Sequence, residues 1–308
     1  MPFFSVIIPL FNKEKYIENT LQSVLNQTFS DYEIIVVNDG STDQSEAIAR
    51  QITDSRIRFF NNDNQGASAA RNFGIGVAQS TYIAFLDADD YWYPEFLETI
   101  HRSISMFPQQ KAYSTAIEIE TGGNVIPARY SISGKRNPTI VDFFDASQKE
   151  CVIWTSSSIF HKDVFAEIGV FDTTILSGQD TDLWIRIGLE YSVAFTNKIL
   201  AKYVYDPTSL SKTKSLTPGK LNFEKFAILE KSNPRLKKYL DLNRYALALK
   251  SKMNGDNTHF EALYQAIDKR NLSLRKRLLI ELPAKALKIL RKLQLELSNY
   301  GLARSVFK

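Results

Sequence analysis

Short apolar runs alternate with amphipathic stretches over the first 110 residues, and this alternation predicts the fold. Four segments have the apolar character of buried strands: Phe3–Pro9, Glu33–Asn38, Arg56–Asn61 and Tyr82–Leu86. Two segments between them carry apolar residues at helical spacing: Ile17, Leu21, Val24 and Leu25, then Ala69, Phe73 and Val77. Strand–helix alternation of this kind predicts an α/β fold with a Rossmann-like, mostly parallel sheet and helices on both faces.

The chain after Pro94 predicts a mixed region and then a helical one. In the mixed region we expect these elements: a helix towards Phe107, a hairpin of Ala112–Glu120 with Val125–Tyr130, short helices at Thr139–Asp145 and Lys162–Ile168, a helix at Asp180–Glu190, and strands at Val193–Thr196 and Ile199–Tyr205. Residues 206–219 are rich in Ser, Thr, Lys and Pro and predict a mobile loop or linker. Residues 220–308 predict a C-terminal helical region, in which Pro283 suits the first turn of the last helix and Gly301 its end.

Polar clusters follow three of the predicted strands, at residues 9–12, 38–40 and 87–90. In open parallel sheets, ligands bind outside the carboxyl ends of the strands, so one crevice lined by all three clusters is expected. The last cluster contains Asp87, Asp89 and Asp90. Because crowded carboxylates repel one another unless a cation neutralises them, this strand end predicts a divalent metal site. The alternative is an acidic turn that caps the following helix, a role that suits Asp90.

Composition, charge and the lack of certain motifs argue against several classes of protein. Apolar residues make up 44% of the chain and charged residues 23%, as in ordinary globular proteins, and no apolar run is long enough to span a membrane. One cysteine, Cys151, leaves no intramolecular disulfide and fits a reducing cytoplasm. No glycine-rich dinucleotide fingerprint follows the first strand and no P-loop is present. The net charge of +4 arises in the tail, where nine basic and two acidic residues lie between Arg275 and Lys308.

At this level of detail the motifs resemble a known family. They are residues 5–12 (SVIIPLFN), 27–29 (QTF), 36–43 (VVNDGSTD), Gly66 with 70–72 (ARN), and 85–90 (FLDADD). In this order and spacing they are similar to the family 2 inverting glycosyltransferases, which have the GT-A fold. The resemblance covers about the first 205 residues. It implies a catalytic domain over 1–205, with a nucleotide-sugar half at 1–110 and an acceptor half at 111–205.

The resemblance also implies roles for residues of the first half. Pro9 and Phe11 match positions that shape the base and ribose pocket, and Asp39 matches the carboxylate that accepts from the nucleotide base. Arg71 matches a residue that points towards the nucleotide. Asp89 matches the ligand of Mn²⁺ or Mg²⁺, and Asp87 the residue that holds the sugar or ribose and supports the metal. The residues taken alone leave other interpretations open: plain packing for Pro9 and Phe11, a turn aspartate at Asp39, and a surface arginine at Arg71. Asn38 departs from the commoner Asp.

In the second half, residues 178–184 (GQDTDLW) resemble the family's acceptor-side motif, in which Asp180 matches the catalytic base. An inverting transfer needs such a carboxylate to remove the proton of the acceptor hydroxyl. A helix N-cap is the alternative for Asp180, and Gln179 departs from the usual Glu. Asp182 is expected to be a surface residue. Asp206 is a further candidate metal ligand, although a turn before Pro207 explains it better.

The last predicted helix carries Ala286, Leu290, Leu293 and Leu297 on one face and Lys285, Lys288 and Lys292 on another. A basic amphipathic helix either lies on an anionic membrane or packs against protein, including a second subunit. No aromatic-interleaved basic patch or binding motif indicates nucleic acid.

Together these features predict a metal-dependent inverting hexosyl- or N-acetylhexosaminyltransferase that uses a nucleoside-diphosphate sugar, in first place a UDP-sugar. The expected acceptor is a growing glycan, either free or lipid-linked, in polysaccharide biosynthesis. The expected location is the cytoplasm or the inner face of the cell membrane. A non-catalytic sugar-nucleotide-binding or scaffold subunit is the alternative. A nucleotidyltransferase would need a glycine- and arginine-rich first loop, which is absent.

Overall fold

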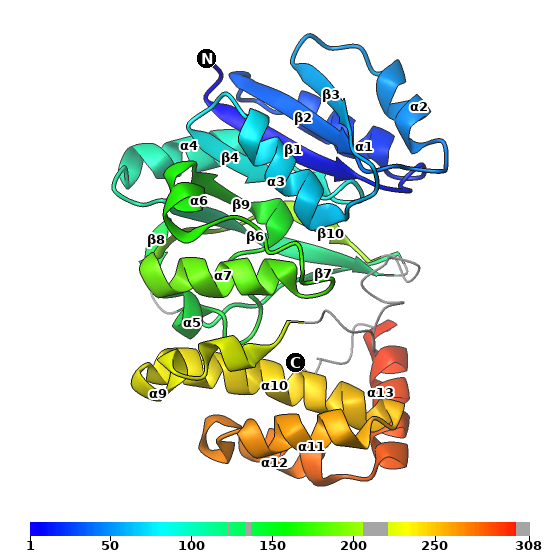
Figure 1. Ribbon diagram of the computed structural model, residues 1–308, viewed down its shortest axis with the longest axis vertical. Coiled ribbons are helices and arrows are strands. Elements are labelled where there is room, and N and C mark those ends of the chain that lie inside the picture. Colours follow the sequence, from blue (N-terminus) through cyan, green and yellow to red (C-terminus); the bar gives the residue numbers. More distant parts are fainter. Residues whose placement is uncertain (122, 133–136, 206–220, 300–308) are drawn as a thin grey trace. The chain divides into compact units, whose positions relative to one another are not determined.

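The computed structural model describes residues 1–121, 123–132, 137–205 and 221–299, the last five of these by their backbone only. Packing of the backbone divides the chain into two compact units. The first comprises Met1–Phe143 and Glu150–Leu221, and the second comprises Phe144–Lys149 and Asn222–Lys308. The elements of both are labelled in Figure 1.

The first unit is built on a single sheet. Its strands are β1 (Phe4–Leu10), β2 (Tyr32–Asn38), β3 (Ile57–Asn61), β4 (Tyr82–Phe85), β5 (Tyr91–Trp92), β6 (Ala112–Thr121), β7 (Asn124–Pro127), β8 (Thr139–Val141), β9 (Ser158–His161) and β10 (Val193–Val204). Within the described residues they lie in the order β3-β2-β1-β4-β9-β6-β10-β5, with β7 paired to β6 and β8 to β10. Strand β1 is parallel to both β2 and β4, whereas β9 is antiparallel to both of its neighbours. The predicted mostly parallel sheet is confirmed.

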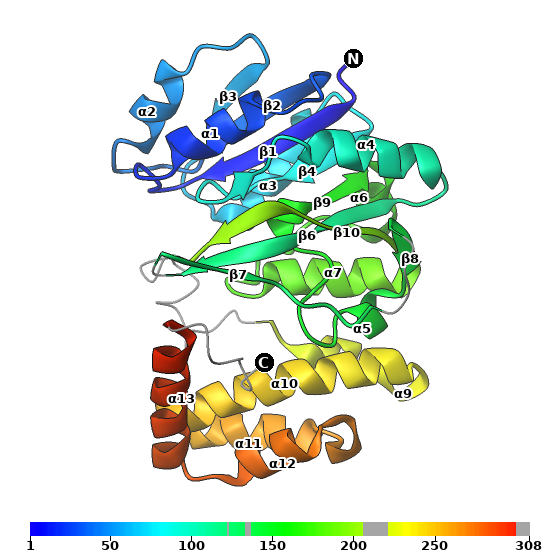
Figure 2. The ribbon, with the colours of Figure 1, turned by 180° about the vertical axis from the view of Figure 1, so that it is seen from behind.

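Helices cover both faces of this sheet, as predicted. They are α1 (Ile17–Leu25), α2 (Ser45–Gln51), α3 (Ala67–Val77), α4 (Phe96–Met106), α6 (Asp163–Ile168) and α7 (Gln179–Glu190), with a 3₁₀ turn η1 at Thr155–Ser157. Helices α3, α6 and α7 lie on the face seen in Figure 1, and α1 and α4 lie on the face seen in Figure 2.

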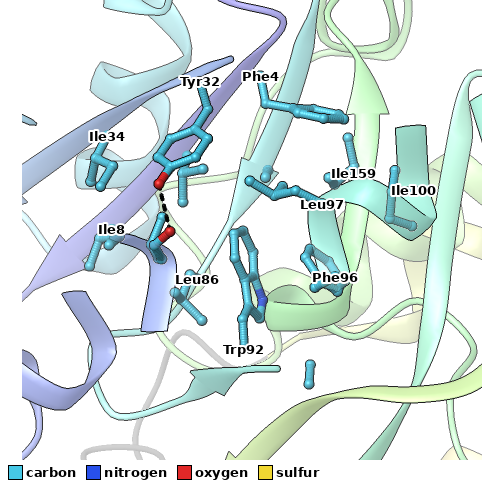
Figure 3. Close-up of a cluster of buried hydrophobic side chains, with 14 of the residues drawn as sticks. Phe4, Ile8, Tyr32, Ile34, Leu86, Trp92, Phe96, Leu97, Ile100 and Ile159 are labelled. Atoms are coloured by element: carbon cyan, nitrogen blue, oxygen red, sulfur yellow. Dashed lines mark hydrogen bonds between the residues drawn. The ribbon is translucent and has the colours of Figure 1, made fainter. Parts of the chain in front are cut away.

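Successive side chains of β1 point to opposite faces of the sheet, and they contribute to the hydrophobic core on both faces. Its even-numbered residues Phe4, Val6, Ile8 and Leu10 are buried in the cluster formed with α1 and α4, part of which Figure 3 shows. There Trp92 stacks on Phe96, with ring centroids 4.2 Å apart, and the Tyr32 hydroxyl donates to the Val24 carbonyl at 2.7 Å. On the other face, a Cβ at Gly74 would lie 2.4 Å from Cγ2 of Ile7, so only glycine lets α3 approach β1 so closely.

Two predictions in the mixed region are wrong in detail. The expected helix at Thr139–Asp145 is a strand, β8, followed by the short helix α5 (Phe143–Ala146). Its β-branched residues Thr139, Ile140 and Val141 favour an extended backbone, and they pair antiparallel with β10. The two strands expected at 193–196 and 199–205 form one strand, β10, with register shifts between Thr196 and Ala201.

The second unit is helical, as the predicted C-terminal extension requires. It contains η2 (Phe223–Phe226), α9 (Leu229–Ser232), α10 (Pro234–Asn254), α11 (Asn257–Ala266), η3 (Lys269–Asn271), α12 (Leu274–Glu281) and α13 (Ala284–Asn299). The Asn233 side chain accepts from the amides of Arg235 and Leu236 and so caps α10, which ends at Gly255 with φ 82°. Tyr245, Leu249 and Leu287 lie in its buried cluster. In the described ranges, no helix has both the length and the apolar character that crossing a membrane requires.

Candidate active site

Neighbouring parallel strands bring the predicted polar clusters to one edge of the sheet. Residues Leu10 and Asn38 are register partners at the ends of β1 and β2, and the Asp39 amide donates to the Leu10 carbonyl at 2.8 Å. Strand β4 lies on the other side of β1, and the Leu86 amide donates to the Ile7 carbonyl at 3.0 Å. The carboxylates that follow β2 and β4 therefore emerge on either side of the end of β1.

Asp39 is almost fully buried and holds the loop that precedes α3. One carboxylate oxygen accepts from the Gln65 amide at 2.9 Å and the other from the Gly66 amide at 2.7 Å. Gly66 has φ 92°, which suits glycine. A carboxylate has about four acceptor positions, so these two hydrogen bonds leave capacity for a base N–H. Neighbouring Asn38 has a structural partner instead, because its Nδ2 donates to Glu46 at 3.0 Å.

Arg71 of α3 is a buried residue, so the surface-arginine interpretation is wrong. Its side chain is 6% exposed, and Nη2 lies 2.5 Å from Oδ1 of Asp87. The guanidinium also lies over the Phe171 ring, 5.3 Å from its centroid. Its Nε and Nη1 atoms are buried and have no hydrogen-bond partner within the described residues. Buried donors are normally paired, so the Arg71 guanidinium has hydrogen-bonding capacity that the described residues do not use.

The three carboxylates that follow β4, those of Asp87, Asp89 and Asp90, have different surroundings. Oδ2 of Asp89 lies 2.5 Å from Nζ of Lys13, and burial raises the pKa of Asp89 despite that ammonium group, with Asp87 raising it further. Asp90 is fully buried: it accepts from the Ser156 hydroxyl at 2.5 Å and from the Val204 amide at 3.0 Å. Burial and the two neighbouring carboxylates raise the pKa of Asp90 well above its usual value. The helix-capping role suggested for Asp90 is therefore wrong; it ties β4 to η1 and β10.

Asp180 lies in the first turn of α7, directly after Gly178 (φ 87°) and Gln179. Its Oδ1 accepts from the Thr181 amide at 2.7 Å, but the N-cap residue of α7 is Gly178, so the N-cap interpretation of Asp180 is wrong. Burial raises the pKa of Asp180, the charge of Arg71 lowers it, and the charge of Asp87 raises it. The charges of Arg71 and Asp87 thus act on Asp180 as well as on each other, so the start of α7 and the end of β4 contribute to one electrostatic environment.

Not every predicted residue lies in that cluster. Pro9 lies in β1 opposite Val37 and Phe11 directly follows the strand; both are half-buried. Asp182, expected at the surface, is completely buried and accepts from Arg186 at 3.0 Å, so that expectation is wrong. Asp206 lies outside the described residues.

Three residues lie near the carboxylates of the site without having been predicted as their neighbours. Lys13 pairs with Asp89, as described above. The Ser156 hydroxyl accepts from the Asp87 amide at 3.1 Å while it donates to Asp90. Tyr203 of β10 is half-buried, and burial together with the charges of the three carboxylates raises its pKa. Lys13 carried a signal, a basic residue three positions after the end of a strand, whereas Ser156 and Tyr203 reach the site only through the sheet order.

Asp87 and Asp89 were predicted to hold a divalent metal ion, and their surroundings bear on that prediction. Among the residues that the structure describes, no group of three or more His, Cys, Asp or Glu side chains is arranged to hold a metal ion. Asp87 and Asp89 supply hard oxygen donors, while Asp90 is engaged with Ser156 and Val204. This donor set fits Mg²⁺ or Mn²⁺, because such ions are commonly held by one or two carboxylates together with substrate phosphates and water.

The sheet order, the helices on both faces and the carboxylates at the strand ends define a GT-A fold. The family model "Glycosyl transferase family 2" matches residues 5–169, which is more than half of the chain. The chain therefore belongs to glycosyl transferase family 2.

Curated relatives and solved structures agree with this assignment. An uncharacterized glycosyltransferase of Rickettsia felis is 33% identical over 201 residues, covering 64% of this chain and 32% of that protein. The uncharacterized glycosyltransferase EpsJ of Bacillus subtilis is 50% identical over 93 residues, covering 30% of this chain and 27% of EpsJ. The chain thus spans about a third of the length of the first curated relatives it matches. The structure of S. aureus TarS 1-349 in complex with UDP-GlcNAc has a TM-score of 0.65 at 19% identity, covering 97% of this chain and 92% of that one.

Proposed function

We propose that the protein is a metal-assisted, inverting glycosyltransferase that moves a sugar from a nucleoside-diphosphate sugar to a hydroxyl of a growing glycan. The observation that carries the proposal is the joint electrostatic site of Asp87, Arg71 and Asp180, with Asp89 beside it. A UDP-sugar is the preferred donor, since the similar TarS structure was solved with UDP-GlcNAc. The transferred group is then a hexosyl or N-acetylhexosaminyl unit.

In this proposal the first half of the unit binds the donor. Asp39 accepts from the uracil N–H with the lone pairs that Gln65 and Gly66 leave unused. Pro9 and Phe11 border the base and ribose. Asp87 accepts from a sugar or ribose hydroxyl. Arg71, which is paired with Asp87, would bind a phosphate of the donor or stack on its base.

Asp89, supported by Asp87, would hold Mn²⁺ or Mg²⁺, with the remaining ligands supplied by the diphosphate and water. A divalent cation bound there would supply Lewis-acid stabilisation of the negative charge on the departing diphosphate. Asp206, the further candidate ligand, stays a prediction.

Asp180 is the proposed general base. Its carboxylate takes the proton of the acceptor hydroxyl while that oxygen forms a bond to the anomeric carbon, and the bond from this carbon to the diphosphate breaks with its electron pair leaving on the nucleotide. Attack from the side opposite the leaving group inverts the anomeric centre. The raised pKa of Asp180 suits this role, because a stronger base accepts a proton more readily near neutral pH.

We assign the protein to polysaccharide biosynthesis in the cytoplasm, acting on a free or lipid-linked glycan. In α13, Leu287 is fully buried while Ile289 and Leu293 are 61% and 48% exposed, so Leu293 does not lie on the packed face. Lys285, Lys288 and Lys292 are exposed on the same helix. Exposed aliphatic and basic residues together suit peripheral contact with an anionic membrane or contact with a second subunit. Flotation with vesicles of 30% phosphatidylserine, compared with a Lys285/Lys288/Lys292→Glu variant, and sedimentation of the free protein distinguish the two.

Release of UDP from a panel of UDP-sugars, with Mn²⁺ and simple sugar acceptors, tests the function. The expected result is release that EDTA abolishes and that Asp180→Asn removes while binding of UDP and Mn²⁺ is retained. Full metal-dependent activity of Asp89→Ala would contradict the metal assignment. Tight binding of a UDP-sugar without turnover for any acceptor would favour the non-catalytic alternative.

A further inference from the structure

Lys13 lies where the proposed cation would bind. It is the third residue after β1, and its Nζ lies 2.5 Å from Oδ2 of Asp89. The side chains of the two residues are only 17% and 14% exposed. The contact is therefore a largely buried ion pair at the end of the sheet.

The backbone around Lys13 is fixed by two interlocked loops. The amides of Asn12, Lys13 and Glu14 donate to the side chains of Ser41, Ser45 and Asp43, at 3.2, 2.6 and 3.1 Å. In return, the amides of Thr42 and Gln44 donate to the side chains of Asn12 and Glu14, at 2.8 and 3.0 Å. The Lys13 backbone is thus anchored beside the site, while its four-carbon side chain can still turn.

The ammonium group of Lys13 and a divalent cation compete for the carboxylate of Asp89. Both need the lone pairs of the same carboxylate, and two positive groups at this distance repel each other strongly in a mostly buried site. The diphosphate of a donor changes this balance, because it brings negative oxygens that a lysine ammonium binds as a point charge. Once it has arrived, both positive groups can be neutralised at the same time.

We propose that Lys13 is a positioning residue that couples entry of the cation to entry of the donor. Without the nucleotide it occupies Asp89 and opposes metal binding; with the nucleotide it turns to the diphosphate and leaves Asp89 to the cation. This inference rests on the proposed function, in which Asp89 is a metal ligand. Its consequence is a large positive coupling between nucleotide and metal affinities, which is reciprocal by thermodynamic linkage.

The test measures Mn²⁺ binding to the full chain by electron paramagnetic resonance of the free ion, with and without saturating UDP. The variants are Lys13→Met, Lys13→Arg and the matched control Lys15→Met, which removes a charge from an exposed neighbouring residue. Without UDP, Lys13→Met is expected to bind Mn²⁺ about tenfold more tightly than the wild type. The enhancement of Mn²⁺ affinity by UDP should fall by a similar factor. Lys13→Arg and Lys15→Met should keep the wild-type coupling.

Equal Mn²⁺ affinities of the wild type and Lys13→Met without UDP, with both binding Mn²⁺ in its presence, would overturn the inference and leave the proposed function intact. No Mn²⁺ binding by any variant even with UDP would overturn the metal site, and this inference with it. Thermal unfolding and UDP binding in EDTA establish that each variant is folded, so that a loss of Mn²⁺ binding is not mistaken for unfolding.

Discussion

Buried carboxylates occur in both units of the molecule, and their surroundings differ. Asp241 of α10 is fully buried, and its oxygens accept from Lys237 at 2.6 Å, Arg244 at 3.2 Å and Asn271 at 2.8 Å. Two cations thus neutralise the charge of one acid, and a side-chain amide donates a further hydrogen bond to it. In the catalytic unit, three acids follow one another within four residues, and Asp90 has only the Ser156 hydroxyl and the Val204 amide as described partners.

This difference separates an acid that two cations compensate from acids that lie beside other acids. A buried carboxylate paired with cations is compensated where it lies, whereas neighbouring carboxylates raise one another's pKa and oppose ionisation. Burial raises the pKa of Asp89, Asp90 and Asp180, and neighbouring carboxylates raise it further, even at Asp89, which is paired with Lys13. Perturbed acids gathered at one sheet edge are typical of functional sites, and they are retained at a cost in stability.

The largest expected effect is that of Asp180→Asn. Removing a general base lowers kcat by about 10²–10⁴-fold. The folded protein raises the pKa of Asp180, so its stability falls as pH rises from the ordinary aspartate value through the raised one. At neutral pH the ionised carboxylate therefore destabilises the fold, and asparagine should leave the free energy of unfolding unchanged or higher. Kinetic assays and urea denaturation check the pair of effects; a loss of both activity and stability would assign Asp180 to the fold.

Asp241→Ala, in the second unit, should lower the stability of the protein rather than its activity. The change leaves the ammonium of Lys237 and the buried guanidinium of Arg244 without that carboxylate, and breaking such a buried pair costs about 3–5 kcal/mol. Urea denaturation followed by circular dichroism measures the loss. The control is Glu261→Ala on the exposed surface of α11, which should change stability by less than about 0.5 kcal/mol. A small effect of Asp241→Ala would remove the contrast between the two regions.

The sequence was sufficient for strands β1 to β4 and for the carboxylates that follow them, for reasons that are local, whereas β8 and β10 were predicted incorrectly. Apolar runs such as Tyr82–Leu86 specify buried strands, and the residues that follow parallel strands must emerge at one edge. Partners from distant segments were not predictable. Ser156 comes to Asp90 because β9 inserts between β4 and β6, an order that no local pattern encodes. Asp182 was misassigned because its position in the first turn of α7 does not show that this turn is buried; its partner Arg186, one turn further on, also donates to the Ile168 carbonyl at 2.7 Å.

The pH dependence of kcat tests whether the surroundings of Asp180 raise its pKa, as expected for an acid that is not compensated by paired cations. Because the Asp180 carboxylate must be ionised to accept a proton, kcat should fall tenfold per pH unit below its pKa. Burial is the largest influence on that pKa and raises it, the Thr181 amide and Arg71 lower it, Asp87 raises it, and the net shift is upward, so the acid limb should lie above the ordinary aspartate value of about 3.9. Arg71→Met removes the lowering charge and should move the limb to higher pH. A limb at or below the ordinary value would contradict the assigned surroundings of Asp180.

The smallest changes in stability are expected when one hydrogen-bonding side chain is removed from each unit, Ser156 from the first and Asn233 from the second. Ser156→Ala removes the hydroxyl that donates to Asp90 and accepts from the Asp87 amide, so a buried acid loses one of its partners at a cost of about 1–3 kcal/mol. Since that amide belongs to a proposed donor-binding residue, the KM for the donor should also rise. Asn233→Ala removes the cap of α10, at a cost of about 1 kcal/mol. Its KM should stay at the wild-type value, because no proposed donor contact involves it. If both variants changed stability alone, Ser156 would belong with the fold, and the site would be confined to the carboxylates, Lys13 and Arg71.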